Sequence, residues 1–296
     1  MLTHECKGNA SYKHLSIKQE NIDLYYKNKP RIFATVPKKG KESLTMIEED
    51  VKAEYEKYNV AFTQKRVHSL LPATTFTDNN RKLLKGLYGS KKKIVKDIRE
   101  WIDSHNKRTY LRKCPYCTLS NAGTTEHILP KEKYPEFAIN ALNLLPCCSI
   151  CNTKKGEDVT TPDGKPFIIN YYYDALPDEQ YLFVDICIDV HGCPNFEYRL
   201  DNPNGIDKEK FELIKRHFEK LGLLERFKTE AAACYTEIEN IIQVDLKEKD
   251  DLSRCLEKLK NTALMDAVEY GSNHWKVVLK LALAESEIYK EYLNKK

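Results

Sequence analysis

Apolar side chains recur at helical spacing in three parts of the chain. Residues 44–58 carry acidic side chains early and lysines late, an order that suits the helix dipole. Residues 81–105 also predict a helix, which Gly89 and Ser90 are expected to break or kink. From about residue 207 the pattern predicts helices up to the end of the chain. The apolar positions behind these expectations are Ile94, Ile98, Trp101 and Ile102, then Phe211, Ile214, Phe218 and Leu221, then Tyr235, Ile238 and Ile242, and finally Trp275, Val278 and Ala282.

Strands are expected mainly between residues 166 and 200. The β-like runs there are Phe167–Ile169, Tyr181–Val190 and Phe196–Leu200, and Arg31–Pro37 could form a further short strand. We therefore expect an α+β fold that is mainly α-helical. It would comprise a mostly helical region with a basic helix (1–105), a compact module (106–165), and a β-rich stretch followed by helices (166–296).

The composition is that of a soluble globular protein. Of the 296 residues, 41% are hydrophobic and 31% are charged, which excludes collagen-like and wholly disordered chains. No apolar run approaches the ~18–20 residues of a membrane helix. The segment Met1–Cys6 has no apolar stretch typical of a signal peptide. We expect a cytoplasmic protein that does not associate with membranes.

The net charge of +4 is distributed unevenly. Residues 81–113 contain twelve Lys or Arg and three Asp or Glu, a local balance of +9, so the rest of the chain sums to −5. Basic blocks attract phosphate, although many are only the solvated face of a helix. Nucleic acid is the partner that this block favours, and its candidate contacts are Lys91, Lys92, Lys93 and Lys96.

Five of the ten cysteines cluster between residues 114 and 151. Two Cys-x-x-Cys pairs, Cys114 with Cys117 and Cys148 with Cys151, can together supply the four thiolates of a tetrahedral structural zinc site. Cys147 could replace Cys148, but the spacing of Cys148 matches that of the first pair. The alternatives are a redox dithiol or unrelated core cysteines. Residues 110–160 have few long periodic segments and little capacity for a large core, so a metal would have to stabilise them.

A second possible metal group lies further along the chain. Cys187, His191 and Cys193 alternate along one predicted strand, so they could share a face. No fourth ligand is evident, and the alternative is a strand end with small buried cysteines.

Three short motifs accompany the cysteine pairs. Glu126-His127-Ile128-Leu129-Pro130 lies between the pairs, Asn143 precedes the second pair, and Cys151 begins a Cys-Asn-x-x-Lys sequence. In this order, over about residues 110–160, the motifs resemble the HNH nuclease family. That resemblance implies a ββα-metal hairpin and helix, and a metal-dependent endonuclease that hydrolyses phosphodiester bonds.

The resemblance implies a role for each motif residue. His127 matches the general base, and imidazole suits this role because its pKa of ~6.5 lets it accept a proton at neutral pH. Glu126 matches an acidic ligand of the catalytic divalent ion, expected to be Mg²⁺ or Mn²⁺, and Asn152 matches the last metal ligand. Asn143 matches the residue that braces the loop. The family more often has Asp where Glu126 stands, which puts the metal geometry in doubt.

Alternative interpretations accompany these roles. His127 could be a hydrogen-bonded structural histidine in a non-catalytic, zinc-stapled binding module. An RNA-cleaving effector, acting for example on tRNA, uses the same chemistry as the DNA endonuclease that we expect. Lys131, Lys154 and Lys155 could contact phosphates or be solvated surface.

The downstream sequence extends the resemblance. An aromatic-Asp stretch, Asn170 to Asp174, is followed by a β-rich segment and helices. This order is similar to HNH subunits of Septu-like and retron-associated anti-phage defence systems. The resemblance implies an ATPase subunit as a partner.

Overall fold

The computed structural model describes residues 44–89, 95–97, 99–100, 113–248 and 250–296. The chain divides after Ala175 into two compact units, called here unit 12–175 and unit 176–296. The expected α+β, mainly helical fold class is confirmed. Among the described residues, the sheets are two antiparallel hairpins, one in each unit.

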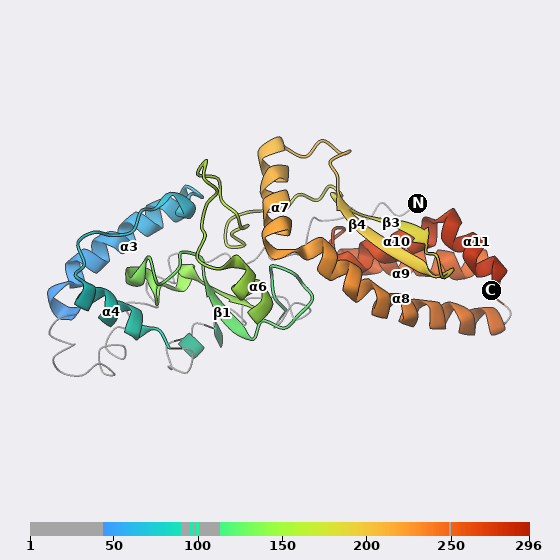
Figure 1. The fold of residues 1–296 in the computed structure, drawn as a ribbon, viewed down its shortest axis with the longest axis horizontal. Helices are drawn as coiled ribbons and strands as arrows, with labels where there is room; N and C mark the ends of the chain where they lie inside the picture. The colour runs from blue at the N-terminus through green and yellow to red at the C-terminus, as the bar shows by residue number, and fades with distance from the viewer. Residues whose placement is uncertain (1–43, 90–94, 98, 101–112, 249) are drawn as a thin grey trace. The chain divides into compact units, whose positions relative to one another are not determined.

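In the described part of unit 12–175, helices precede and follow a small hairpin (Figure 1). The helices are α3 (Glu48–Thr63), α4 (Asp78–Leu87) and α6 (Ser149–Lys155). The hairpin strands are β1 (Thr124–His127) and β2 (Leu144–Cys147). Three single-turn 3₁₀ helices complete the unit: η1 (Val67–Ser69), η3 (Pro135–Phe137) and η4 (Ala141–Asn143).

Helix α3 packs against the connection between β1 and β2 through aromatic contacts. The rings of Tyr58 and Phe137 meet edge to face at 4.9 Å between centroids, and both side chains are fully buried. The Tyr58 hydroxyl donates to the Leu142 carbonyl at 3.0 Å. These contacts fix the connection that joins the two strands.

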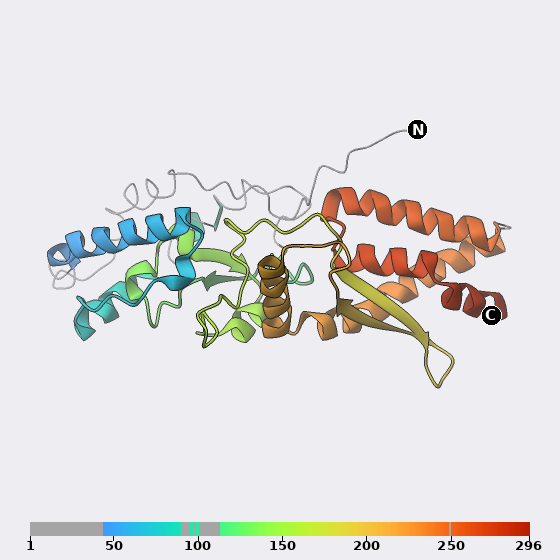
Figure 2. The same cartoon turned by 90° about the horizontal axis from the view of Figure 1, so that it is seen from above.

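Unit 176–296 contains the second hairpin and five helices. The strands β3 (Leu182–Ile188) and β4 (Pro194–Leu200) pair antiparallel, with Ile186 opposite Phe196. The helices are α7 (Lys208–Leu221), α8 (Leu223–Lys247), α9 (Leu252–Tyr270), α10 (Trp275–Glu285) and α11 (Glu287–Lys295). The helices α8, α9 and α10 run side by side, and α10 also contacts β3 (Figure 2).

Polar capping and turn residues explain where these helices begin and end. The Asp207 and Asp251 carboxylates accept from main-chain N–H groups three residues ahead, at 3.0 and 2.8 Å, and so cap α7 and α9. Gly222 adopts a left-handed conformation (φ 59°) that separates α7 from α8. The aromatic core includes stacked Phe227 and Trp275.

Several predicted elements shift or fall outside the described residues. The helix predicted over 44–58 is confirmed and extends further, because residues 44–46 are helical and α3 runs from Glu48 to Thr63. The strand predicted at Phe167–Ile169 is wrong, because this segment is irregular. The helix predicted over 81–105 forms in part: α4 ends at Leu87, extended Tyr88 follows next to the break expected at Gly89 and Ser90, and residues 95–97 and 99–100 are helical again. The helices predicted from residue 207 onward are confirmed. Arg31–Pro37, Lys91–Lys93 and the apolar stripe Ile94, Ile98, Trp101 and Ile102 lie outside the description.

In the part of the chain that the structure describes, every helix is too short or too polar to cross a lipid bilayer.

Candidate functional site

The candidate site is a hairpin followed at once by a helix. β1 pairs antiparallel with β2, with Thr124 opposite Cys147 and His127 opposite Leu144. Helix α6 begins directly after β2, because Cys148 has extended backbone and caps it. The helix ends at Gly156, whose positive φ of 61° suits glycine. β1, β2 and α6 therefore form a ββα unit.

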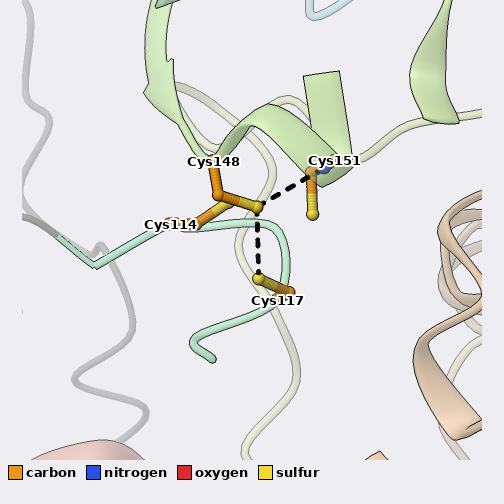
Figure 3. Close-up of side chains that lie close together, drawn as sticks. All are labelled: Cys114, Cys117, Cys148 and Cys151. Atoms are coloured by element: carbon orange, nitrogen blue, oxygen red, sulfur yellow. Dashed lines mark hydrogen bonds between the residues drawn. The ribbon is translucent and has the colours of Figure 1, made fainter. Parts of the chain in front are cut away.

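The four predicted zinc ligands lie together (Figure 3). The Sγ atoms of Cys114, Cys117, Cys148 and Cys151 are all within 4.8 Å of one another, and all four residues are buried. Cys148 supplies a sulfur 3.8 Å from that of Cys117, and the same sulfur accepts the Cys151 N–H at 3.4 Å. Four converging thiols in a polar loop fit a tetrahedral zinc ion.

A tight turn brings Cys114 and Cys117 to this cluster. The Thr118 N–H donates to the Cys114 carbonyl at 2.8 Å, and Thr118 has a positive φ of 55°. Hydrogen bonds with the thiols of Cys117 and Cys151, together with burial, raise the pKa of Cys114. A bound cation would favour the thiolate form, because it would replace these hydrogen bonds and compensate for the cost of burying the charge.

Cys147 is not part of the cluster. Its sulfur lies 3.5 Å from the Thr124 hydroxyl, on the neighbouring strand. Consecutive residues of an extended chain point to opposite sides, so Cys148 turns to the other three cysteines and Cys147 turns away. The structure therefore brings Cys148, rather than Cys147, to the four-thiol group.

Asn143 clamps the connection between the strands. Its side chain is fully buried, its Oδ1 accepts the Leu129 N–H at 2.7 Å, and its Nδ2 donates to the carbonyls of Leu129 and Phe137 at 3.0 and 3.2 Å. The Asn143 carbonyl also accepts the Ile128 N–H at 2.9 Å. The amide thus fixes the main chain immediately after His127.

His127 lies at the end of β1 with its ring buried. Its Nε2 lies 3.0 Å from the Ala138 carbonyl, which only accepts hydrogen bonds, so Nε2 carries the proton and Nδ1 has a lone pair. Burial, aided by Lys131 and Lys155, lowers the pKa of His127 to about 4. The imidazole is therefore neutral at pH 7. The ring of Tyr88 meets it edge to face at 4.4 Å between centroids.

Glu126 is paired with a buried lysine. Lys155 places its Nζ 2.7 Å from the Glu126 Oε1, and the two side chains are only 3% and 4% exposed. Burial raises the pKa of Glu126, and the Lys155 ammonium opposes this shift. Lys155 thus has no access to a nucleic-acid backbone. The phosphate contact considered for it from the sequence is wrong because the residue is buried.

Asn152, in α6, lies beside the face of β1 that carries Glu126. Its Nδ2 donates to the Thr124 hydroxyl at 3.3 Å, and Thr124 and Glu126, two residues apart in the strand, share a side. A carboxylate and an amide oxygen on one side of the hairpin are ligands that Mg²⁺ and Mn²⁺ accept. The donor chemistry therefore fits the predicted divalent ion.

The remaining candidate cations differ in their surroundings. Lys131 pairs with Glu132 at 2.7 Å, and Lys154 is exposed. Arg99, within the basic block, donates to the Gly123 carbonyl at 3.2 Å and also bonds the Ala122 carbonyl. That arginine supports the entry to β1 through main-chain contacts.

The second predicted metal group is not assembled. Among the described residues, Cys187, His191 and Cys193 form no cluster of converging ligands. Both cysteines are exposed near the turn of the β3–β4 hairpin. The Asp189 carboxylate organises this turn by accepting the N–H groups of His191 and Cys193, each at 2.9 Å.

One further group of potential ligands comprises Asp245, Asp250 and Cys255. Lys258 already pairs with both carboxylates, lying 3.1 Å from Asp245 Oδ2, and Arg254 lies 3.3 Å from Asp250. These cations neutralise the two carboxylates, so the group is an ion-pair network rather than a metal site.

The sequence analysis missed two residues of the site. Tyr88 contacts the His127 ring and hydrogen-bonds to Thr125, but it follows a helix end and belongs to no motif. The burial of Lys155, by contrast, could have been predicted from the sequence. Lys155 follows buried Cys151 by four residues in α6, and residues four apart share a helix face.

Known proteins of similar sequence include a phage protein and a Septu protein. Protein ea31 of Escherichia phage lambda is 25% identical over 255 residues, which cover 76% of this chain and 80% of ea31. Septu protein PtuB of Bacillus thuringiensis is 38% identical over 81 residues, 26% of this chain. The match spans only 30% of PtuB. No family model matches the chain, and neither does any solved structure.

Proposed function

We propose that this protein is a metal-dependent HNH endonuclease that hydrolyses phosphodiester bonds in DNA. The observation that carries the proposal is the neutral, buried imidazole of His127 at the end of β1, next to Glu126 in a ββα unit. The Asn143 clamp and the four-cysteine group support it, because both occupy the places that the sequence resemblance assigns to them.

In the proposed reaction His127 is the general base. Its Nε2–H is held by the Ala138 carbonyl, so Nδ1 accepts a proton from the attacking water. Burial keeps the ring neutral before substrate binds, and the negative charge of a phosphodiester would raise the pKa of the imidazole as the proton is transferred. Asn143 maintains the position of the ring through the main chain of Leu129.

The oxygen atoms of Glu126 and Asn152 would hold the divalent ion, and the four cysteines would hold zinc. When bound, the divalent ion would relieve the negative charge that develops on the leaving oxygen. Zinc in the thiol group would be structural, joining the turn at Cys114 to the start of α6.

The test is cleavage by purified wild-type protein and His127→Ala. Plasmid DNA and a tRNA pool are incubated separately with Mg²⁺ or Mn²⁺. We expect wild type to cut the plasmid and His127→Ala to lose ~10²–10⁴-fold in rate, because a positioned base contributes about that much. Zinc content and thermal unfolding should stay unchanged in the variant.

Wild-type-like cleavage by His127→Ala would refute the proposed base. Cleavage of tRNA alone would replace DNA by RNA as substrate. Loss of zinc in the variant would show that His127 is structural and would favour the non-catalytic binding module.

The similarity to PtuB supports a place in anti-phage defence. We propose that the nuclease acts there beside an ATPase subunit, as the sequence resemblance implies. Phage plating on cells expressing the chain with its candidate ATPase tests this role. Protection that is lost with His127→Ala would support it, and equal plating with and without the wild-type chain would contradict it.

A further inference from the structure

Lys155, at the end of α6, makes three contacts with its ammonium group, two of them buried and the third partly buried. Nζ lies 2.7 Å from Glu126 Oε1, 3.1 Å from the His127 carbonyl oxygen and 3.5 Å from the Gly156 carbonyl oxygen. An ammonium group has three N–H donors, and these acceptors match them in number. One lysine therefore binds both members of the Glu126-His127 pair, the first by its carboxylate and the second by its main chain.

The ion pair cancels the charge of the predicted metal ligand. With side chains 3% and 4% exposed, the pair is poorly screened by water, so an arriving cation would meet the ammonium as well as the carboxylate. Among the described residues, no cluster of three or more His, Cys, Asp or Glu includes Glu126. The protein thus offers the divalent ion one neutralised carboxylate and the amide of Asn152.

Such a donor set is weak for a hard cation by itself. Mg²⁺ usually binds proteins through one or two carboxylates together with phosphate oxygens of the substrate. A phosphodiester at this site would add the negative charge that Lys155 cancels. The ion and the substrate would then bind with positive cooperativity, each raising the affinity of the other by the same factor.

We propose that Lys155, by cancelling the charge of the Glu126 carboxylate, makes divalent-ion binding depend on the substrate phosphate. This inference rests on the proposed function, because it takes Glu126 as the metal ligand. It assigns a role to a lysine that contacts neither solvent nor nucleic acid.

The test is Mn²⁺ binding measured by electron paramagnetic resonance, which needs no turnover. Wild type, Lys155→Met, Lys155→Arg and Lys154→Met are titrated as free proteins. We expect weak binding by wild type, and binding tighter by on the order of tenfold in Lys155→Met, where the repelling charge is gone. Lys155→Arg keeps the charge and should bind weakly. Lys154→Met removes an exposed charge from the same helix and should bind as wild type does.

A second measurement does not depend on the folding of Lys155→Met. His127→Ala protein, which should cut ~10²–10⁴-fold more slowly than wild type, is titrated with Mn²⁺ in the presence and absence of a short DNA duplex, and the duplex alone is the control. We expect the duplex to tighten Mn²⁺ binding by on the order of tenfold. Equal affinity with and without duplex would overturn the inference, as would folded, zinc-loaded Lys155→Met that binds Mn²⁺ no more tightly than wild type.

A Glu126→Gln variant separates failure of this inference from failure of the proposed function. If Glu126→Gln weakens Mn²⁺ binding but Lys155→Met does not strengthen it, only the role of Lys155 is overturned. If Glu126→Gln leaves Mn²⁺ binding unchanged with and without duplex, Glu126 is not the metal ligand; this inference then loses its basis, and the proposed nuclease keeps its base His127 but needs another metal ligand.

Discussion

Asn143 stabilises an irregular segment through side-chain hydrogen bonds to main-chain groups, which in helices and sheets bond to one another. The connection between β1 and β2 contains only single-turn helices, and the Asn143 amide satisfies main-chain groups of Leu129 and Phe137 inside it. Buried polar groups that lose such partners destabilise the folded state. The position of His127 therefore depends on a residue sixteen positions later in the chain.

Replacing Asn143 by Ala should lower the free energy of unfolding by about 2–4 kcal/mol, because three buried main-chain groups lose their partners. Urea denaturation of the zinc-loaded protein measures this change. The matched control is Asn152→Ala, which removes one partly exposed hydrogen bond to Thr124 and should cost less than about 1 kcal/mol. Equal stabilities of the two variants would contradict the clamp.

At the scale of elements, the stability of α6 depends on Cys148, which caps the helix. The helix has seven residues, fewer than the ~12–15 at which an isolated helix becomes marginally stable. The Cys148 sulfur accepts the Cys151 N–H and so supplies the cap that serine or aspartate usually provides. The same sulfur belongs to the four-thiol group.

The two neighbouring cysteines should therefore respond differently to substitution. We expect Cys148→Ser to lose the tightly bound zinc, because one of four ligands is gone, and Cys147→Ser to keep it. Metal analysis of the purified variants measures this difference. The reverse result would assign Cys147 as the ligand. Wild-type protein that folds without containing zinc would show that the four cysteines do not form a metal site.

The sequence was most informative where periodicity or close spacing carries the signal. Apolar residues at helical spacing predicted the helices after residue 207, and paired Cys-x-x-Cys spacing predicted the four-thiol group. The strand expected at Phe167–Ile169 failed because a short apolar run does not distinguish a strand from a buried irregular segment. The contact of Tyr88 with His127 joins residues far apart in sequence, and no local pattern encodes it.

At the scale of the whole molecule, the two units are stabilised by different means. Both units bury aromatic side chains, but the described part of unit 12–175 adds the four-thiol group to its small ββα unit, whereas unit 176–296 relies on the packing between its helices and hairpin. For example, Tyr198 donates to the Trp275 carbonyl at 3.1 Å, and the Asn273 Oδ1 accepts two main-chain N–H groups of β3 and the residue before it.

Zinc removal should consequently have a local effect. On treatment with a strong chelator, we expect amide hydrogens of residues 113–156 to exchange faster, because the turn and α6 lose their common ligand. Helices α8 and α10 should keep their protection. Hydrogen exchange measured by mass spectrometry resolves these segments. A comparable loss of protection in α8 and α10 would show that zinc stabilises the entire chain.

If the four-thiol group binds zinc as we propose, the double use of the Cys148 sulfur makes the first turn of α6 depend on the metal supply of the cell. Asn152 and Lys155 are held in place by a helix whose first turn depends on that sulfur. A cell short of zinc would synthesise the polypeptide without completing the site that these residues build. Under the nuclease function that we propose, chains made during zinc starvation would stay inactive without any change in gene expression.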